Sequence, residues 1–320
     1  MDAQRLAIVV HHTDMDGWAS AWVVNEWLKN QDLEVKFFSH NYGQTIDHIE
    51  TFITQNKSRL SDIYLVDISL PDLFMQTYAA YITWLDHHVS AIEHVAELEA
   101  QGLVLKNHYA KSSIDGQRVA ACELCWQTFH DEPMPKFIHW SGRYDVWDHR
   151  EPEVLELNAY VGITFINSDE NPPFLTPEFN ALASAAGVLT ACLEGRAALK
   201  WRDTFNRINS RRNAYVKCWT VSGNRIPIAI INAAGLDSYY FDTVFAKYPE
   251  LKMAIFFHYS FRSNNWIISF RSLDPSYSSL ETMQTALTEI YGADVISMGG
   301  HNGSCGATVS DIRPFLATIH

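Results

Sequence analysis

Along the first 150 residues, short continuous apolar runs alternate with longer segments in which apolar residues recur every three or four positions. The continuous runs predict buried strands at residues 6–12, 34–40, 62–69 and 80–88. Between the first two runs, WASAWVVNEWLKN places Trp18, Trp22 and Val23 on one face of a helix. Strands that alternate with helices in this way predict an α/β fold, with a mainly parallel sheet flanked by helices.

A second pattern of this kind starts after residue 220. RIPIAIINA, LKMAIFFHYS and NWIISFRS are predicted strands, and a helix is expected to open with a capping box formed by Ser278 and Glu281. The apolar residues that this helix should turn inward are Leu280, Met283, Leu287 and Ile290. We therefore predict a larger domain at residues 1–195, a linker helix at 196–219 and a smaller α/β domain at 220–320.

The segment between the two patterns is expected to hold a surface loop and a long helix. NSDENPPFLTPEF, at residues 167–179, has the proline and asparagine content of a loop, and a helical stretch follows at roughly 180–218. The second half of that stretch carries seven of the 24 basic residues, namely Arg196, Lys200, Arg202, Arg207, Arg211, Arg212 and Lys217. These residues either line a phosphate-binding cleft or form the solvated face of a connecting helix.

Polar side chains gather where three of the N-terminal strands end. The clusters are His12, Asp14 and Asp16 after the first strand, Asp67 at the third, and Asp86, His87 and His88 at the fourth. In open α/β sheets, ligand sites lie outside the carboxyl ends of the strands. Because parallel strands end at the same edge of a sheet, we expect all three clusters to lie together.

The first cluster, in HTDMDG, offers one imidazole and two carboxylates within five residues. Alternate positions of an extended segment point the same way, so His12, Asp14 and Asp16 are expected to converge. Gly17 would relieve crowding as the backbone enters the helix. Carboxylates this close repel each other unless a cation compensates. Taken alone, the segment is explained equally well as an exposed, aspartate-rich helix cap.

Two further aspartates are ambiguous on their own. An aspartate at the end of a strand, such as Asp67, often only caps the following turn. Asp145, in SGRYDVWDH, has an alternative interpretation as an ordinary ion-pair partner of Arg143, and Asp148 and His149 lie close by in the sequence.

Considered jointly, the candidates form one set of four carboxylates and two imidazoles: His12, Asp14, Asp16, Asp67, His87 and Asp145. Mixed nitrogen and oxygen ligands of this kind suit Mn²⁺, with Mg²⁺ and Co²⁺ as alternatives. A shared carboxylate allows two such ions to lie about 3.5–4 Å apart, which is the spacing used in two-metal phosphoester hydrolysis.

Composition and charge narrow the function classes. Hydrophobic residues make up 47% of the chain, enough for a sizeable core, and five scattered cysteines fit reduced thiols, with Cys122 and Cys125 as buried positions of a helix. The start of the chain lacks the features of a signal peptide, and no apolar run approaches the roughly 18 residues of a membrane helix. We therefore expect a cytoplasmic protein without a membrane partner. A net charge of −13 argues against long duplex nucleic acid and is compatible with short phosphorylated substrates.

These segments, in this order, resemble the motifs of the DHH phosphoesterase superfamily. HTDMDG is similar to its first motif, the aspartate of LVDIS to its second, DHH to its third and RYD to its fourth. The terminal MGGHNGSCGA, preceded by SFRS, is similar to the glycine-rich signature of the DHH-associated C-terminal domain. The spacing of two residues between His12 and Asp14 resembles the oligoribonuclease (nanoRNase) branch and counts against the pyrophosphatase branch. The match takes His12 over His11, and Asp145 over Asp148.

The resemblance implies a role for each matched residue. His12 and Asp14 would bind a first metal ion, Asp67 would bridge two ions, and the second would be completed by Asp16, His87 and Asp145. His88 would face the substrate phosphate, and Asp86 would orient the histidine pair. Substrate would be held, in a cleft between the domains, by Arg271 and by a loop containing Gly299, Gly300 and His301.

The activity implied by the resemblance is that of a phosphodiesterase with two divalent metal ions, expected to be Mn²⁺. The enzyme would degrade very short oligoribonucleotides in the 3′–5′ direction to nucleoside monophosphates. A homodimer is compatible with the resemblance. The alternatives are hydrolysis of cyclic (di)nucleotides and removal of the 3′-phosphate from small nucleotides such as 3′,5′-bisphosphoadenosine. A non-catalytic nucleotide sensor is less favoured, because it has no need to keep six ligands.

Overall fold

A computed structural model describes residues 4–165, 172–232, 238–251, 253–272, 279–301 and 303–320. The chain divides into two compact units, a first unit of residues 1–199 and a second unit of residues 200–320. The 29-residue helix α9, Ala185–Asn213, crosses this division. In the described part of the chain, no helix is long and apolar enough to cross a membrane.

The first unit is built on a five-stranded sheet in which every pair of neighbouring strands is parallel, with the order β2-β1-β3-β4-β5. The strands are β1 Arg5–His11, β2 Leu33–Ser39, β3 Leu60–Val66, β4 Ile82–Leu85 and β5 Asn107–His108. The four apolar runs therefore form strands as predicted, each shortened at the end that carries the polar residues. The expected α/β architecture is confirmed.

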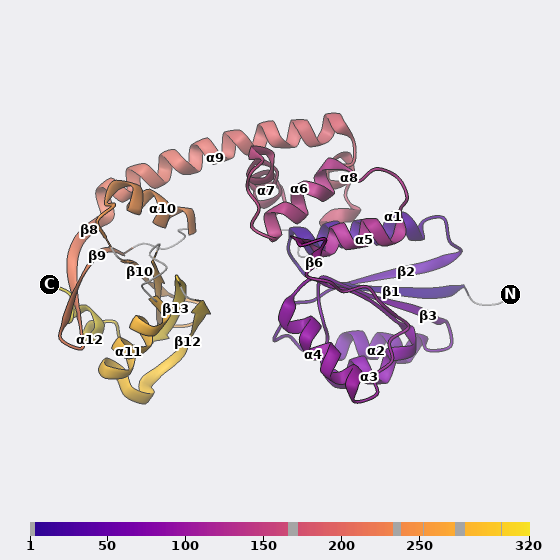
Figure 1. Ribbon diagram of the computed structural model, residues 1–320, viewed down its shortest axis with the longest axis horizontal. Coiled ribbons are helices and arrows are strands. Elements are labelled where there is room, and N and C mark those ends of the chain that lie inside the picture. Colours follow the sequence, from indigo (N-terminus) through magenta and orange to yellow (C-terminus); the bar gives the residue numbers. More distant parts are fainter. Residues whose placement is uncertain (1–3, 166–171, 233–237, 252, 273–278, 302) are drawn as a thin grey trace. The chain divides into compact units, whose positions relative to one another are not determined.

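Helices cover both faces of this sheet (Figure 1). On one face lie α1 Met15–Leu28 and α5 Ala121–Phe129, and on the other lie α2 Asp47–Asn56, α3 Asp72–Tyr78 and α4 Val89–Ala100. Alternate residues of β1 serve the two cores, because side chains of a strand point to opposite faces. Ala7 and Val9 pack in the α1–α5 core, whereas Leu6, Ile8 and Val10 pack in the other.

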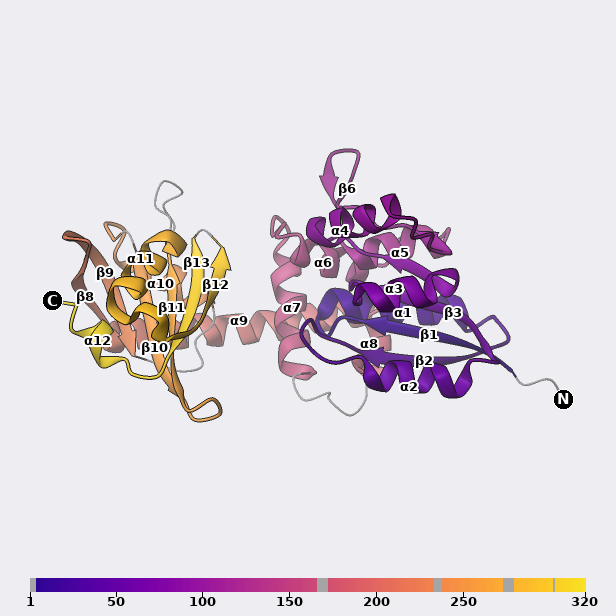
Figure 2. The same ribbon diagram turned by 90° about the horizontal axis from the view of Figure 1, so that it is seen from below.

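Further helices extend the first unit on the α1 side, namely α6 Lys136–Asp145, α7 Pro152–Thr164 and α8 Pro177–Ala181. Between β5 and α5, a short hairpin of β6 Ser113–Ile114 and β7 Gln117–Arg118 projects from the unit (Figure 2).

The expectation of a surface loop at 167–179 is wrong for its described part. Residues 173–175 form a 3₁₀ turn and α8 follows, with the Thr176 hydroxyl capping it by accepting a hydrogen bond from Phe179 N. Phe174 and Phe179 are fully buried. The prolines are compatible with these short helices because they occupy first-turn positions, where no backbone N–H donor is needed.

The second unit holds a six-stranded sheet in the order β12-β13-β11-β10-β9-β8. Its strands are β8 Ala214–Val221, β9 Asn224–Asn232, β10 Met253–Ser260, β11 Asn265–Arg271, β12 Val295–His301 and β13 Ser304–Val309. Only β9 and β10 pair in parallel. The helices are α10 Ser238–Lys247, α11 Ser279–Tyr291 and α12 Arg313–Leu316.

Two expectations for this region are refined. The long helix ends at Asn213, and residues 214–221 form β8 where helix was expected up to about 218. In α11, Met283 and Leu287 are buried and Ile290 packs against the same core, as predicted. Ser278 and the side chains of Leu280 and Glu281 lie outside the described residues, so the capping box stays a prediction.

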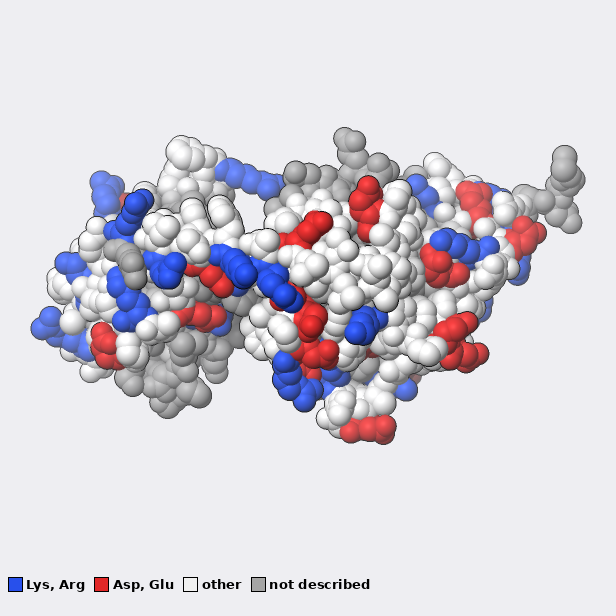
Figure 3. Space-filling model, turned by 90° about the horizontal axis from the view of Figure 1, so that it is seen from above, with Lys and Arg blue, Asp and Glu red and all other residues white. Residues whose placement is uncertain are grey.

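Two of the basic residues of α9 pair with acidic residues. Figure 3 shows blue side chains along the helix interspersed with red ones. Arg196 makes a two-pronged ion pair with Glu156 of α7, and Arg202 pairs with Asp203. For these two arginines, the charge is already balanced within the chain, which favours the interpretation as a solvated connecting helix. A phosphate-binding role for the other basic residues stays a prediction.

Candidate metal centre

The predicted polar clusters lie at one edge of the parallel sheet because of strand register. His11, the last residue of β1, pairs with Val66 of β3, and Val66 pairs with Leu85 of β4. The residues that follow these three strand ends are therefore neighbours in space. The prediction that the strand-end clusters converge is confirmed.

The turn after β1 holds His12 and Asp14 against each other. Asp14 is the N-cap of α1: its Oδ1 accepts a hydrogen bond from Gly17 N at 2.9 Å, and its Oδ2 lies 2.8 Å from His12 Nδ1. A Cβ atom at Gly17 would lie 2.3 Å from the backbone oxygen of His12, so only glycine fits. The crowding assigned to this glycine from the sequence is confirmed.

The expected extended conformation of this segment is wrong. Only His12 directly follows the strand, because Asp14 caps α1 and Asp16 belongs to its first turn. The side chains still converge, since the capping turn folds Asp14 back toward His12 while the helix carries Asp16 into the interior, where it is buried.

The two histidines at the end of β1 have different surroundings. His11 is fully buried, with Nδ1 2.7 Å from the backbone oxygen of His12 and Nε2 3.3 Å from Ser39 Oγ. Burial lowers its pKa to about 4. His12, which contacts Asp14 and approaches Asp67, is the histidine that joins the cluster.

Asp67 lies at the centre of the candidate site. It is buried, and its backbone has φ 60°, a conformation that aspartate tolerates better than most residues. Its Oδ2 lies 3.8 Å from His12 Nδ1, and its Oδ1 lies 3.4 Å from His87 Nε2 and 3.8 Å from His88 Nδ1. Among the described residues, neither carboxylate oxygen has a hydrogen-bond partner.

A second group of ligand atoms surrounds His87. Its Nε2 lies 2.9 Å from Asp145 Oδ2 and 3.6 Å from Asp16 Oδ2. The approach to Asp145 is close, but it does not have hydrogen-bond geometry, and this nitrogen has no hydrogen-bond partner among the described residues. Asp16 is held from behind: its Oδ2 accepts a hydrogen bond from Ala121 N at 2.9 Å and its Oδ1 accepts one from Cys122 N at 2.8 Å.

The contacts of Arg143 distinguish between the two candidate aspartates, which are Asp145 at the end of α6 and Asp148 after it. Arg143 pairs with Glu123 of α5 and approaches Asp148 at 3.8 Å, and Asp148 is also paired with Arg150. Asp145 instead contacts His87. The interpretation of Asp145 as a partner of Arg143 is therefore wrong, and the geometry favours Asp145 over Asp148 in the cluster.

Asp86 organises the histidine pair through one oxygen. Its Oδ1 accepts hydrogen bonds from the backbone N of His87 at 2.7 Å and of His88 at 3.0 Å, and it lies 2.8 Å from His88 Nδ1. Asp86 is fully buried, whereas the His88 side chain is 40% exposed. This arrangement leaves His88 as the more accessible member of the pair.

The candidate ligand atoms form three overlapping groups of three. Within each group, the atoms lie within 4.8 Å of one another. The groups are His12 with Asp14 and Asp67, Asp67 with His87 and His88, and Asp16 with His87 and Asp145. All six residues predicted as metal ligands belong to these groups, and Asp67 and His87 each belong to two. Oxygen and imidazole nitrogen donors in this mixture suit Mn²⁺ or Mg²⁺ better than thiolate-preferring ions.

The pKa values of three residues in the centre are shifted by burial and by the neighbouring charges. Burial and the neighbouring Asp145 carboxylate raise the pKa of Asp16 to about 6, and burial with the Asp16 charge raises the pKa of Asp67 well above its usual range. Burial alone would lower the pKa of His87, but the Asp145 and Asp16 carboxylates outweigh it and raise the pKa to about 9. Positive charge is thus favoured here, and the partnerless oxygens of Asp67 fit a divalent cation.

The residues predicted to bind substrate lie in the second unit, on neighbouring strands. Arg271 ends β11 and pairs with Ser304 of β13, which also pairs with His301 of β12. The expected glycine loop is wrong, because Gly299 and Gly300 lie within β12. Gly303, the described residue between β12 and β13, has φ 89°.

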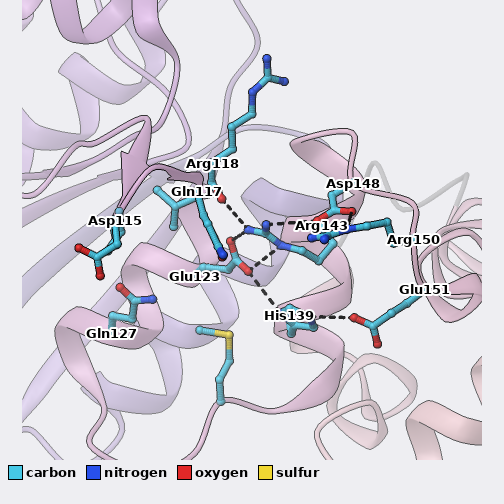
Figure 4. Close-up of a pocket in the computed structure, with 13 residues that line it drawn as sticks. Asp115, Gln117, Arg118, Glu123, Gln127, His139, Arg143, Asp148, Arg150 and Glu151 are labelled. Atoms are coloured by element: carbon cyan, nitrogen blue, oxygen red, sulfur yellow. Dashed lines mark hydrogen bonds and ion pairs between the residues drawn. The ribbon is translucent and has the colours of Figure 1, made fainter.

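A pocket of about 730 Å³ lies beside α5 and α6, and it was not predictable from the sequence (Figure 4). It is lined by the β6–β7 hairpin, by Glu123 and Gln127 of α5, by His139 and Arg143 of α6, and by residues 148–151 in part. None of the six predicted ligands, all of which the structure describes, lines it.

Cys122 and Cys125 are buried in α5, as predicted. Glu123 has a capping signal in the sequence, because it lies three residues after the N-cap of α5. Its pairing with Arg143, 20 residues later, has no such local signal.

No family model matches the chain, and no curated protein matches it. Among solved structures, the pGpG-specific phosphodiesterase PggH from Vibrio cholerae is 14% identical, covers 95% of this chain and 93% of its own, and has a TM-score of 0.52. An uncharacterized protein from Helicobacter pylori G27 is 15% identical over 97% of this chain and 95% of its own, with a TM-score of 0.42. The exonuclease RecJ bound to manganese is 13% identical over 98% and 88%, with a TM-score of 0.49. At this identity, the likeness to PggH shows a common fold.

Proposed function

We propose that this protein is a metal-dependent phosphodiesterase of the DHH superfamily that hydrolyses very short oligoribonucleotides to nucleoside monophosphates in the 3′–5′ direction. The observation that carries the proposal is Asp67, whose two buried oxygens have no hydrogen-bond partner among the described residues. One oxygen faces His12 and the other faces His87. The position of this carboxylate supports the proposal that it bridges two cations.

The other residues of the cluster divide around Asp67 into two proposed ligand sets. His12 and Asp14 would hold one ion with Asp67, and Asp16, His87 and Asp145 would hold the other with it. Two bound divalent cations, with Mn²⁺ as the proposed metal, would act as Lewis acids toward the phosphate oxygens and lower the pKa of water.

His88 is proposed to serve the substrate rather than a metal. The Asp86 carboxylate raises the pKa of His88 by accepting a hydrogen bond from its Nδ1. The ring is thereby oriented, and its protonated form is stabilised. A protonated imidazole with an accessible edge is suited to donate a proton to the leaving oxygen of a phosphodiester.

The short substrate is supported by charge and by the solved structure with the shared fold. A net charge of −13 is unfavourable for a long polyanion, whose binding depends on neutralising many phosphates. PggH is a phosphodiesterase specific for pGpG. This likeness favours linear dinucleotides. Hydrolysis of cyclic (di)nucleotides or of 3′,5′-bisphosphoadenosine, which uses the same chemistry, is the second candidate function.

The test is a comparison of turnover by the purified protein, with Mn²⁺ in excess, on pApA, pGpG, a pentaribonucleotide, cyclic di-AMP and 3′,5′-bisphosphoadenosine. We expect the linear dinucleotides to be cleaved fastest, with nucleoside monophosphates as products and no cleavage in EDTA. Faster turnover of the cyclic dinucleotide or of the bisphosphate would favour the second candidate. Tight binding of a nucleotide without any turnover would overturn the enzyme assignment in favour of a sensor.

A further inference from the structure

We define the α5–α6 joint as Ala120, Glu123, Gly142 and Arg143, whose neighbours along the two helices contact or belong to the proposed metal centre. Arg143 Nε donates a hydrogen bond to Glu123 Oε1 at 3.1 Å, and its Nη2 donates a second one to Oε2. The Arg143 side chain is 12% exposed and that of Glu123 is 7% exposed. Both residues line the 730 Å³ pocket, and Figure 4 shows their side chains paired there.

Glu123 ties this pair to the start of α5. Its Oε2 also accepts a hydrogen bond from Ala120 N at 3.1 Å, so one carboxylate engages both the first turn of α5 and the guanidinium of α6. The next two backbone amides, those of Ala121 and Cys122, are the donors that hold Asp16. The position of Asp16 therefore depends on the start of α5.

The other end of the ion pair leads to Asp145. Arg143 and Asp145 both belong to the last turn of α6, which ends at Asp145. Arg143 is anchored further, because its Nη2 donates to the backbone oxygen of Arg118 at 3.0 Å. Asp16 and Asp145 approach the same nitrogen of His87 from α1 and α6.

The two helices are packed as closely at this point as their side chains allow. A Cβ atom at Gly142 would lie 2.8 Å from both Cγ and Cδ of Glu123 and 3.1 Å from Cβ of Ala120. Glycine is thus needed for α6 to approach α5 at the position where the ion pair forms. The joint combines a steric contact with two charge-assisted hydrogen bonds, which are among the stronger and more directional contacts in proteins.

We infer that the Glu123–Arg143 pair is a positioning device that sets the separation between Asp16 and Asp145, and so the metal affinity of the His87 side of the centre. This inference rests on the proposed function for the identity of the metal site. Partners of metal ligands that lie outside the ligand set typically change metal affinity or activity by 10- to 100-fold when they are removed.

The experiment measures Mn²⁺ binding to the full chain by titration calorimetry, with bound Mn²⁺ counted by electron paramagnetic resonance. The test variant is Glu123→Gln, which keeps the side-chain volume but removes the charge-assisted pair. The matched control is Glu156→Gln. Glu156 is also buried in the first unit and also makes a two-pronged pair, but its partner is Arg196 of α9 and not a residue of α5 or α6.

We expect the wild type and Glu156→Gln to bind two ions, and Glu123→Gln to bind one ion normally and the other about 10- to 100-fold more weakly. Arg143→Lys is the second variant, and it also applies if Glu123→Gln does not fold. It keeps the positive charge but replaces the planar fork with a point charge, so it should weaken the same single site.

Equal weakening of both sites, or wild-type affinity at both sites in either folded variant, would overturn the inference. A wild type that binds no divalent ion would overturn the inference and the proposed function together. Selective loss of one site in a protein whose wild type cleaves no oligonucleotide would support the positioning role and overturn only the proposed activity.

Discussion

Two regions of the first unit bury carboxylates, and they satisfy them in opposite ways. Glu123, in the α5–α6 joint, receives hydrogen bonds from Arg143 and from Ala120 N. Burial alone would raise the pKa of Glu123, but His139 and Arg143 outweigh it and lower the pKa. Asp67 is at least as buried as Glu123, but it has no hydrogen-bond donor among the described residues. Its pKa is raised.

The contrast distinguishes a carboxylate whose charge is balanced by donors of the chain from one whose oxygens have no hydrogen-bond partner among the described residues. A buried charge is tolerated when its partner is supplied by the chain, and it is expensive when no partner is present. The difference cannot be explained by exposure, since both side chains are buried. The partners of each oxygen therefore identify a functional carboxylate better than its burial does.

The prediction with the largest effect removes the charge of Asp67. Asp67→Asn should reduce metal-dependent cleavage of pApA by more than the 10- to 100-fold typical of an outer partner of a metal site, because both proposed ions lose their shared ligand. Asparagine keeps the volume and tolerates the φ of 60°. In EDTA, the melting temperature should be unchanged or higher, since a repelling buried charge is gone.

The control for this variant is Asp115→Asn. Asp115 also has a positive φ, of 50°, but it is exposed and outside the three ligand groups. It should leave turnover and melting temperature unchanged. Near-normal turnover of Asp67→Asn would contradict the bridging role.

The second prediction is a pH dependence whose sign depends on the metal. In EDTA, the raised pKa of Asp16, about 6 instead of 3.8, means that the folded state holds a proton that the unfolded chain loses. The free energy of unfolding should therefore fall as pH rises from about 4 to about 6. For His87, with a pKa of about 9 instead of 6.5, the added stability is present below pH 6.5 and is lost as pH rises through 9.

Bound Mn²⁺ should reverse this trend, since protons compete with the metal for the same atoms. The stabilisation by Mn²⁺, about 2.7 kcal/mol at a free concentration 100 times its Kd, should grow as pH rises from 5 to 8. Melting temperatures measured across this range in EDTA and in Mn²⁺ check both signs. Parallel pH profiles in the two conditions would rule out metal binding by these residues.

The third and smallest prediction compares one glycine from each region. Gly17→Ala would bring a Cβ to 2.3 Å from a backbone oxygen, so we expect a loss of about 1–3 kcal/mol in the free energy of unfolding. Gly142→Ala should cost less, because its Cβ would meet side-chain atoms of Glu123 at 2.8 Å rather than a backbone oxygen at 2.3 Å.

Gly162→Ala in α7 is the control, since a Cβ there meets nothing within 4 Å and alanine favours helix. Urea unfolding of the three variants gives the ranking. An equal cost for Gly17→Ala and Gly162→Ala would show that crowding at His12 does not constrain the turn.

The part of the centre that could be predicted from the sequence is the part set by strand ends. Parallel strands of continuous apolar residues fix where His12, Asp67 and Asp86 lie, because neighbouring strands end at the same edge. The choice between Asp145 and Asp148 was not predictable in this way. It depends on Arg143 pairing with Glu123 and approaching Asp148, and this pairing joins two helices.

Other features depended on similar long-range contacts. The first-turn position of Asp16 in α1 follows from where Asp14 caps the helix, and its two amide donors come from residues more than 100 positions later. The glycines of β12 looked like a loop because a strand pairing with β13 leaves no local signal at Gly299 and Gly300. Phe174 and Phe179 are buried in a segment whose prolines suggested a loop.

The backbone donors of Asp16 have a consequence for the design of an inactive, substrate-trapping variant. Each oxygen of Asp16 faces one backbone N–H of α5, so an asparagine there would turn its own NH₂ group toward a donor and break the contact. Asp67 faces no such donor among the described residues, and its asparagine variant has no comparable conflict. For capturing an uncleaved nucleotide in a crystal, Asp67→Asn is therefore the substitution to choose, and Asp16→Asn is the one to avoid.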